Sequence, residues 1–308
     1  MLEVYKESGI PALLLGLRDR EEFCSGLLAY LVSEREGMLS SLSRRSIIFG
    51  GPLYSKNDDL GGLRQLLEEY RRRARGRALF TEVRNHSFDL SPVRGVMTSS
   101  GFQYEPHLNF LLDLTQPAER LWSALIDFRR RAIRQGERAG VRVEEVTHMD
   151  QIQECYRLLK ETFERVRLPL AHRPSDLLLR NAFRLLRPKG FLHMFLAELK
   201  GRAIATLVTL PYKDRMYLWL GGSSRSFQKY RPNDVLHWDV MMWAKDRGYK
   251  VIDFLGAGTP EKADGVRDFK GAYGAKLAEF GAYRLIHSPI RYMIAYRLFP
   301  LYRRFFLR

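Results

Sequence analysis

Apolar residues recur along the chain in two series that follow the same order. Each series has two apolar runs of strand length around a polar turn, a glycine pair, a run with helical spacing that a glycine closes, and a further run of strand length. The first series predicts strands at 27–33 and 38–49 with a turn at 34–37, the pair Gly50-Gly51, a helix that buries Leu63, Leu66, Leu67 and Tyr70 and stops at Gly76, and a strand at 78–83.

The second series repeats this order in the later part of the chain. From the second glycine of the pair to the glycine that ends the helix, the chain runs from Gly51 to Gly76 in one series and from Gly222 to Gly248 in the other. The match is one of pattern and not of residue identity, and it predicts a duplicated α/β domain. The second series predicts strands at 203–212 and 215–220 around a turn at Lys213-Asp214, the pair Gly221-Gly222, a helix that carries Leu236, Val240, Trp243 and Ala244, and a strand at 251–256.

An arginine-rich segment lies between the two series. A strand is expected to end near Asp113 and a helix to begin near Pro117, because apolar residues then recur at helical spacing from Leu121 to Ile133. Two interpretations of the opposite, cationic face stay open: a solvated surface, or a contact with an anionic partner. This face carries Arg129, Arg130, Arg131, Arg134 and Arg138, of which Arg129, Arg130 and Arg134 are the candidates for binding RNA.

Helices are also predicted at 151–164 and 176–186, and the tail from 283 to 308 forms a basic, aromatic segment. The tail has six arginines and no carboxylate side chain. We expect its apolar stripe to pack onto the protein, and contact of 286–308 with an anionic membrane surface is the alternative. The stripe holds Ile290, Met293, Ile294, Arg297, Leu298 and Leu301.

The charge balance narrows the class of partner. Among 308 residues, 51 Lys and Arg stand against 35 Asp and Glu, so the net charge is +16. Such a basic chain is expected to bind polyanions such as tRNA, phospholipid head groups or diphosphate-bearing substrates, or else to have a generally basic surface.

The lone Cys24 and Cys155 are expected to be reduced core thiols. With no signal peptide and no apolar run of the ~20 residues that span a bilayer, we expect a cytoplasmic protein, at most peripheral at the inner face of the membrane.

The sequence lacks the familiar catalytic signatures. It has no HExxH, no GxSxG, no Walker loop and no metal-spaced His/Cys cluster, so we expect neither a metal nor a cofactor. His107, His193 and His237 stand in apolar surroundings and are expected to be hydrogen-bonded structural histidines. The candidates that remain are cations at the predicted strand ends.

Five cations follow the two strands of the second series: Arg225, Lys229 and Arg231 after the glycine pair, and Arg267 and Lys270 after the last strand. A cation fixed at a strand end could bind phosphates, or stabilise the oxyanion that forms when an amine attacks an acyl ester.

Two carboxylates and two aromatic rings of the same region are further candidates. Asp253 and Asp268 are placed to orient the amine or act as its base, and the alternative is that they neutralise neighbouring arginines. Tyr230 and Trp219 are candidate walls of a pocket, and the alternative is that they belong to the core.

This region resembles a known family. A Gly-Gly-Ser-Ser strand end, a basic loop with Pro-Asn, a helix with Trp-Ala, an Asp-Phe strand and the run Gly-x-x-x-Phe-Lys-x-x-Tyr-Gly occur in this order between Gly221 and Gly274. The order resembles the second domain of the Fem-type peptidoglycan aminoacyltransferases. The resemblance covers about residues 105–285, with a weaker echo, SRRSIIFGGPLY, at 43–54.

The resemblance implies an α/β (α+β) fold of two tandem GNAT-like acyltransferase domains, each a mixed, mostly antiparallel sheet flanked by helices. They would comprise 1–115, which the tail 286–308 could complete, and 116–285. Family members move an amino acid from aminoacyl-tRNA to the amine of a lipid-linked or nucleotide-linked cell-wall precursor, and the resemblance implies no cofactor.

Residue by residue, the resemblance places Phe269 and Lys270 near the aminoacyl ester, with Lys270 contacting the tRNA end or stabilising the tetrahedral oxyanion. Because the substrate supplies the nucleophilic amine, no activated side-chain nucleophile is required. The candidates for binding the precursor are Ser223, Arg225, Lys229, Tyr230, Arg231, Asn233, Trp219, Arg267 and, from the weaker echo, Arg45.

The chain also departs from known patterns. The loop after Gly222 lacks the Gln/Arg-x-x-Gly-x-Gly/Ala pattern that cradles the CoA pyrophosphate in single-domain GNAT enzymes, and no long Lys/Glu-rich hairpin for tRNA is visible. Two alternatives therefore stay open. One is a GNAT-type N-acyltransferase that uses acyl-CoA or acyl-carrier protein on an envelope polysaccharide or lipid, and the other is a non-catalytic RNA- or membrane-binding protein.

Overall fold

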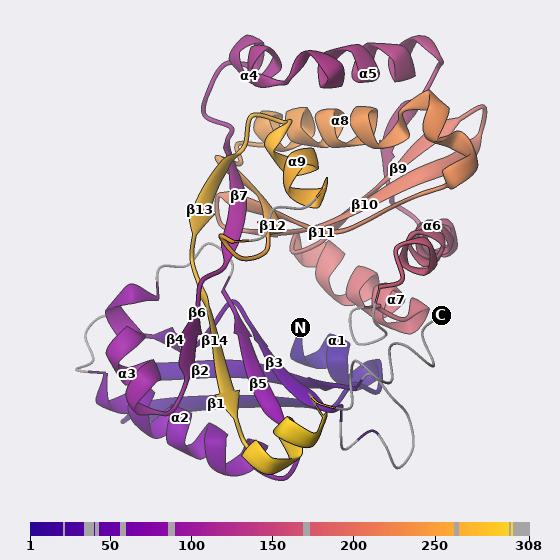
Figure 1. Cartoon of the computed structure of the whole chain (residues 1–308). Helices are drawn as coiled ribbons and strands as arrows, with labels where there is room; N and C mark the ends of the chain where they lie inside the picture. The colour runs from indigo at the N-terminus through magenta and orange to yellow at the C-terminus, as the bar shows by residue number, and fades with distance from the viewer. Residues whose placement is uncertain are drawn as a thin grey trace. The chain divides into compact units, whose positions relative to one another are not determined.

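The computed structural model describes residues 1–20, 22–33, 40, 43–55, 60–85, 90–168, 173–261, 265–295 and 297. The chain divides into two compact units (Figure 1). The N-terminal unit comprises Leu2–Pro106 and Phe280–Arg308, and the central unit comprises Met1 and His107–Glu279. The expected boundaries were 115 and 285. The structure divides the chain earlier at both places, because a strand at 108–113 pairs within the central sheet and one at 282–286 pairs within the N-terminal sheet.

The N-terminal unit is built on a sheet in the order β1-β2-β3-β5-β14-β6, with β4 paired to β2. Its helix α2 packs on the sheet through the predicted face from Leu63 to Tyr70, which is buried, so that prediction is confirmed. The elements are α1 (Leu2–Glu7), β1 (Ala12–Asp19), β2 (Glu22–Val32), β3 (Arg45–Phe49), β4 (Leu53–Tyr54), α2 (Gly61–Ala74), β5 (Phe80–Arg84), η2 (Ser91–Val93), α3 (Arg94–Ser99), β6 (Gln103–Glu105) and β14 (Ala282–Ile286).

Two details of the first predicted series differ from the structure or cannot be compared with it. Strand β1 was not predicted, although it pairs with β2 along its whole length. The second strand was expected over 38–49, whereas β3 begins at Arg45. The predicted turn at 34–37 lies outside the described residues.

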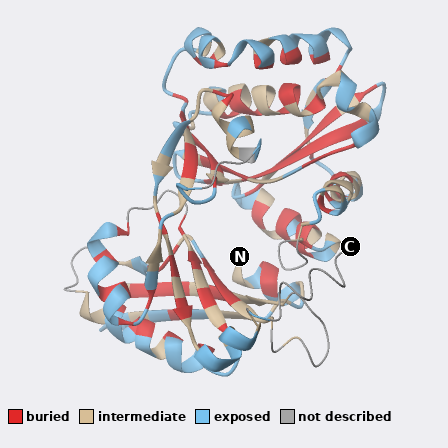
Figure 2. Ribbon diagram, viewed as in Figure 1, coloured by how far each residue is buried: buried red, intermediate tan, exposed pale blue. Residues whose placement is uncertain are grey.

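The central unit is built on a sheet in the order β13-β7-β12-β11-β10-β9-β8. Buried residues line its strands and the helix faces packed on them (Figure 2). The elements are β7 (Leu108–Asp113), α4 (Ala118–Ala124), α5 (Asp127–Arg138), β8 (Arg142–Glu145), α6 (Ile152–Arg165), α7 (Asp176–Leu186), η4 (Arg187–Lys189), β9 (His193–Leu199), β10 (Arg202–Tyr212), β11 (Arg215–Ser223), η5 (Arg225–Tyr230), α8 (Pro232–Asp246), β12 (Val251–Gly256), α9 (Gly265–Gly271) and β13 (Lys276–Glu279).

The predicted repeat is present in the topology of both sheets. In the N-terminal unit, β2 and β3 are antiparallel, and α2 leads from β3 to β5, which lies parallel to β3. In the central unit, β10 and β11 are antiparallel, and α8 leads from β11 to β12, which lies parallel to β11. The same hairpin, helix and parallel strand therefore occur twice.

Strands β11 and β12 separate at the end of the central sheet. They pair only from Arg215 opposite Val251 to Tyr217 opposite Asp253. Beyond this point β11 continues along β10 as far as Ser223, whereas the register of β12 on β7 shifts between Asp253 and Gly256. The two strand ends thus diverge, and most of the predicted site residues follow these ends in the chain.

The arginine-rich segment forms two helices and not the single predicted one. Leu125 and Ile126 have extended backbone angles and break the segment between α4 and α5. The break turns Leu125 into the core, where it is 2% exposed, and leaves Phe128 45% exposed.

Residues 289–295 of the tail are helical. The expectation that their apolar stripe is packed was wrong, because Ile290, Met293 and Ile294 are 70%, 47% and 43% exposed. Tyr292, on another side of this helix, meets the ring of Phe80 edge to face. Leu298 and Leu301 lie outside the described residues. Among the described helices, none is long and apolar enough to cross a membrane.

Candidate functional site

The end of β12 is shaped by a buried carboxylate. Asp253 is 0% exposed, and its Oδ2 accepts a hydrogen bond of 3.2 Å from the side-chain amide of Asn109 on β7. Its Oδ1 accepts the backbone N–H of Leu255 at 2.7 Å, and Leu255 has a left-handed φ of 59°. The carboxylate thus stabilises a backbone turn that a leucine would otherwise avoid. A role for Asp253 as a base stays a prediction.

Lys270 lies at this strand end. Its Nζ donates to the backbone carbonyls of Leu255 at 3.1 Å and of Gly256 at 2.6 Å, so α9 holds the ammonium against the turn that Asp253 supports. Arg267, on the same helix, donates from Nη2 to the carbonyls of Ala257 at 2.9 Å and of Thr259 at 2.6 Å. Two of the predicted cations are therefore fixed at the end of β12.

The other two residues predicted on α9 lie differently. Asp268 is exposed, whereas Phe269 is half-buried and packs against the main core of the central unit. The ring of Phe269 meets that of Tyr273 edge to face at 5.3 Å between centroids. The aromatic side chain therefore anchors α9 beside the strand end.

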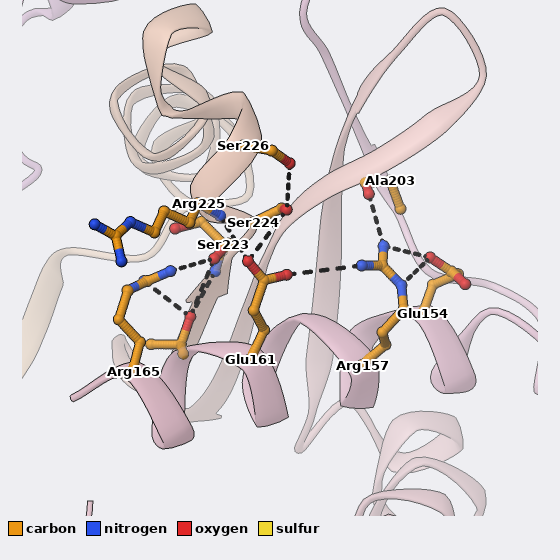
Figure 3. A network of polar contacts seen from close by, with 10 residues as sticks. Glu154, Arg157, Glu161, Arg165, Ala203, Ser223, Ser224, Arg225 and Ser226 are labelled. Atoms are coloured by element: carbon orange, nitrogen blue, oxygen red, sulfur yellow. Dashed lines mark hydrogen bonds and ion pairs between the residues drawn. The ribbon is translucent and has the colours of Figure 1, made fainter. Parts of the chain in front are cut away.

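The end of β11 is held by a second polar network, shown in Figure 3. Three successive backbone N–H groups find partners within the chain. Ser223 donates to Thr162 Oγ1 at 2.9 Å, Ser224 to the carbonyl of Ile204 at 2.9 Å, and Arg225 to Glu161 Oε1 at 2.7 Å. The carboxylate of Glu161 thus occupies a place that the phosphate of a ligand could otherwise take.

Two arginines of α6 hold this network in place. Arg157 lies 4.0 Å from Oε2 of Glu161, and it also donates to Glu154 at 2.7 Å and to the carbonyl of Ala203 at 2.9 Å. Arg165 Nη1 donates to the carbonyl of Ser223 at 3.0 Å. Figure 3 shows Arg165 beside Ser223 at the end of β11 and Arg157 beside Ala203, with Glu161 between the two arginines along α6.

Strand β11 and helix α6 approach each other closely at Gly222. A Cβ atom on Gly222 would lie 2.7 Å from the carbonyl oxygen of Leu158 and 2.8 Å from the Cα of Leu159, both backbone atoms. At Gly221 the nearest atom would be a side-chain carbon 3.7 Å away. Only the second glycine of the pair is therefore required by packing.

The predicted basic loop is the short helix η5. Arg225 and Lys229 are exposed on it, and Tyr230 is half-buried. Arg231 has a left-handed φ of 56°, and its guanidinium lies 5.0 Å from the centre of the Phe128 ring. Arg225 and Lys229 are therefore the η5 cations most open to an anionic ligand.

Along the chain, Trp219 precedes η5 and Asn233 follows it. The side-chain amide of Asn233, in the first turn of α8, donates to Ser223 Oγ at 3.0 Å and so ties α8 to the end of β11. Trp219 is half-buried on β11.

The arginine-rich face divides into buried and exposed members. Arg129 is 9% exposed and forms an ion pair with Asp234 of α8, and its guanidinium lies 4.3 Å from the centre of the Phe269 ring. Arg130 pairs with Asp127 and donates to the carbonyl of Ser123 at 2.8 Å. Arg134 is exposed, 5.3 Å from the centre of the Trp122 ring. Of the three RNA candidates, Arg134 is the one on the surface, and Arg129 connects α5 to the site.

His237 of α8 lies next to Phe269. Its ring is 5.2 Å from that of Phe269 and 5.5 Å from that of Tyr273, and its Nδ1 is 2.7 Å from the carbonyl of Asn233. Burial lowers the pKa of His237 to about 4, with Asn233 and Asp234 opposing the shift. The imidazole is therefore neutral at physiological pH, as expected of a hydrogen-bonded histidine.

Arg45 lies in the N-terminal unit, within a separate ion cluster. It is 3.8 Å from Glu82, which Arg84 contacts at 2.9 Å and Arg284 at 3.9 Å. Burial would raise the pKa of Glu82, but the three guanidinium groups together lower it. The cluster holds more positive than negative charge.

One cavity of about 340 Å³ lies between α5, β8 and α8. Burial and the charge of Glu137 raise the pKa of Asp239, which lines it, to about 6. None of the predicted site residues lines it, and among the described residues no group of His, Cys, Asp and Glu could hold a metal ion. The lining residues are Glu137, Gly140, Val141, Arg142, Val143, Glu144, Val235 and Asp239.

The structure groups most predicted site residues at the two diverging strand ends of the central sheet. Glu161 and Asp234 were not among the predicted site residues, and His237 was predicted to be a structural histidine only. Glu161 lies about 60 residues before its partners and carries no local signal. Asp234 and His237 could have been found from their place beside the Pro-Asn pair at the start of α8.

Comparisons with known proteins agree with this architecture. Residues 127–271 match the model of the acetyltransferase (GNAT) domain. No curated protein matches the chain. Among solved structures, FemX is 14% identical with a TM-score of 0.70, and the match covers 95% of this chain and 92% of FemX.

Two more structures share the fold. The C-terminal domain of a putative lysylphosphatidylglycerol synthetase from Agrobacterium fabrum is 14% identical, with a TM-score of 0.59 and coverage of 91% of this chain and 85% of that one. A tandem GNAT protein from the clavulanic acid biosynthesis pathway is 12% identical, with a TM-score of 0.58 and coverage of 90% and 84%. The chain therefore has a Fem-like tandem GNAT fold, and residues 127–271 of its central unit match the acetyltransferase (GNAT) domain.

Proposed function

We propose that the chain transfers an amino acid from aminoacyl-tRNA to the amine of a lipid-linked or nucleotide-linked cell-wall precursor. The GNAT domain and the Fem-like fold support acyl transfer. The observation that carries the proposal is the position of Lys270, whose ammonium is fixed at the end of β12 beside Phe269, in the motif that resembles the Fem-type transferases.

In this proposal the chemistry needs no side-chain nucleophile. The neutral amine of the acceptor attacks the ester carbonyl of the donor, a C–N bond forms, and the ester C–O bond breaks. The carbonyl oxygen becomes negative in the tetrahedral intermediate. The ammonium of Lys270 would stabilise that charge, and removal of one such donor typically costs roughly 3 kcal/mol of barrier.

The end of β11 favours a donor other than acyl-CoA. In single-domain GNAT enzymes the corresponding loop cradles the CoA pyrophosphate, but here the N–H groups of Ser223, Ser224 and Arg225 already have partners. A phosphate would have to displace the carboxylate of Glu161 from Arg225. The net charge of +16 and the exposed arginines of α5 suit an RNA donor instead.

The acceptor is expected to carry a diphosphate. Arg225 and Lys229 are exposed next to the diverging strand ends and suit such a group. Arg45, in the ion cluster of the N-terminal unit, is a further candidate.

A lipid acceptor is the second candidate. The exposed apolar side chains of Ile290, Met293 and Ile294 favour it, as does the likeness of the fold to that of a protein described as a lysylphosphatidylglycerol synthetase. In this case the aminoacyl-tRNA donor and the role of Lys270 stay the same, but a hydroxyl of phosphatidylglycerol attacks the ester carbonyl in place of an amine, so a new C–O bond forms and the product is an ester.

Substitution of Lys270 tests the proposed role. Lys270→Ala should lower transfer of labelled amino acid from charged tRNA by at least about a hundredfold while the fold is retained. The matched control is Lys245→Ala, because Lys245 also donates to a backbone carbonyl of the central unit, that of Leu114 at 3.0 Å, but at the other end of α8. Undiminished transfer by Lys270→Ala would overturn the assignment.

A further inference from the structure

One ring nitrogen of His237 forms a hydrogen bond within α8, and the other forms none with the described residues. Nδ1 lies 2.7 Å from the carbonyl of Asn233, one helical turn earlier in α8, and only a protonated Nδ1 can donate to that oxygen. In the neutral imidazole, Nε2 then carries the lone pair. Among the described residues Nε2 has no hydrogen-bond partner. The helix therefore presents His237 as an acceptor of a proton or a hydrogen bond.

The surroundings of His237 hold this neutral, accepting form. Phe254, Phe269 and Tyr273 contribute aromatic rings around it, at 6.4, 5.2 and 5.5 Å between centroids. The charged groups that face it are Asp234 on its own helix, Arg129 on α5 and Lys270 on α9, and the two cations oppose protonation. The imidazole is thus neutral through the neutral pH range, and its Nε2 is unprotonated and can accept a hydrogen bond.

A second polar group at the same place also lacks a partner. Tyr273 is 0% exposed, and its hydroxyl has no hydrogen-bond partner among the described residues. Unsatisfied buried hydroxyls are costly, and each one calls for an explanation such as a catalytic role or a bound water or ion. Two polar groups without a hydrogen-bond partner among the described residues, Nε2 of His237 and the hydroxyl of Tyr273, therefore belong to side chains that pack beside Phe269, the residue before Lys270.

We propose that His237 is a catalytic residue of this transfer: its Nε2 accepts a hydrogen bond from the attacking amine and takes up one of that amine's protons. This inference rests on the proposed function. When the neutral amine attacks the ester carbonyl, its nitrogen becomes positively charged. His237 removes one proton from that nitrogen and passes it to the ester oxygen as the C–O bond breaks. The products are an amide and a free hydroxyl, and the imidazole ends neutral.

Three variants separate catalysis from packing. His237→Asn keeps an N–H donor at the position of Nδ1, and so the contact with Asn233, but lacks Nε2. His237→Gln keeps a polar atom near Nε2 but offers no base. His237→Ala removes the ring. The control, His148→Gln, alters an exposed histidine before α6.

The readout is the single-turnover rate of amino acid transfer from charged tRNA, with the fold checked by thermal unfolding. We expect both His237→Asn and His237→Gln to lose about a hundredfold or more, and His148→Gln to match the native protein. In His237→Ala, added imidazole should restore part of the rate in proportion to its neutral fraction. Pyrazole, a ring of the same size and much weaker basicity, should not.

Each outcome bears on one claim. If the native protein transfers amino acid and His237→Asn does so within a few fold, the role of His237 is overturned while the proposed function stands. Equal rescue of His237→Ala by imidazole and pyrazole would also overturn it, because the ring would then only fill space. If the native protein gives no transfer while a control transferase is active, the proposed function fails and the inference fails with it. If His237→Asn does not fold, the rescue of His237→Ala decides.

Discussion

Removal of either partner of the ion pair between Arg129 and Asp234 is expected to destabilise the central unit strongly. The two side chains belong to residues that are 9% and 5% exposed, and the guanidinium lies over the rings of Phe269 and Tyr273 at 4.3 and 5.1 Å from their centres. Truncation of one partner leaves the other charge buried and unpaired, which costs about 3–5 kcal/mol. Arg129→Ala and Asp234→Ala should each lose that much free energy of unfolding.

Replacement of both charges at once should cost far less. Arg129→Met with Asp234→Leu exchanges the pair for apolar side chains of similar volume, and such exchanges are often neutral or stabilising. The coupling between the two single substitutions is therefore expected to be several kcal/mol. Arg134→Ala is the control, because Arg134 is exposed on the same helix, and its effect should stay within about 0.5 kcal/mol.

Urea unfolding followed by tryptophan fluorescence measures this cycle on the correct unit. All four tryptophans, Trp122, Trp219, Trp238 and Trp243, lie in the central unit, so their emission reports on that unit and not on the N-terminal one. The free energies follow from linear extrapolation. Losses below about 1 kcal/mol for both single alanine variants, or additive effects in the double variant, would refute the buried pair.

Three further results are expected. Gly222→Ala should destabilise the central unit by about 1–3 kcal/mol because its Cβ meets the backbone of α6, whereas Gly221→Ala should have little effect, and equal urea midpoints would contradict the close approach. Burial lowers the pKa of both His237 and His287 to about 4. Between about pH 6.5 and about pH 4 the unfolded chain therefore binds protons at these histidines that the folded chain does not bind, and the free energy of unfolding should fall as the pH drops through this range. His237→Gln and His287→Gln should flatten this fall in thermal unfolding, and unchanged slopes would contradict the shifts. Arg134→Ala should weaken tRNA binding without loss of stability, and unaltered binding together with an unaltered salt slope would remove Arg134 from the RNA surface.

Local patterns predicted the repeated architecture well. The spacing of glycines and apolar residues indicated the hairpin, helix and parallel strand in both units, because each set lies within about 60 neighbouring residues. The unit boundaries were harder, since β7 pairs with β12 and β14 pairs with β5 across long stretches of chain. The break between α4 and α5 was missed as well, because Leu125 keeps the helical spacing while its backbone is extended.

In the site, too, residues of a local motif could be predicted, whereas their distant partners could not. Phe269 and Lys270 stand in one short motif and could be singled out from it. The partners that set their surroundings come from elsewhere: Asn109 contacts Asp253 from 144 residues away, and Asp234 pairs with Arg129 from 105 residues away. A row of arginines looks like one surface in a sequence, and only tertiary structure shows that Arg129 is turned inward.

The central claim is that this chain moves an amino acid from tRNA onto a cell-wall precursor. In the most direct test, the protein is incubated with lipid-linked and nucleotide-linked muropeptides and with a pool of tRNA that is charged with labelled amino acids. A parallel reaction uses the same tRNA pool after ribonuclease treatment. We predict label in a muropeptide that ribonuclease abolishes. Absence of transfer while a control transferase is active, or transfer only when an acyl-CoA is supplied, would contradict the claim.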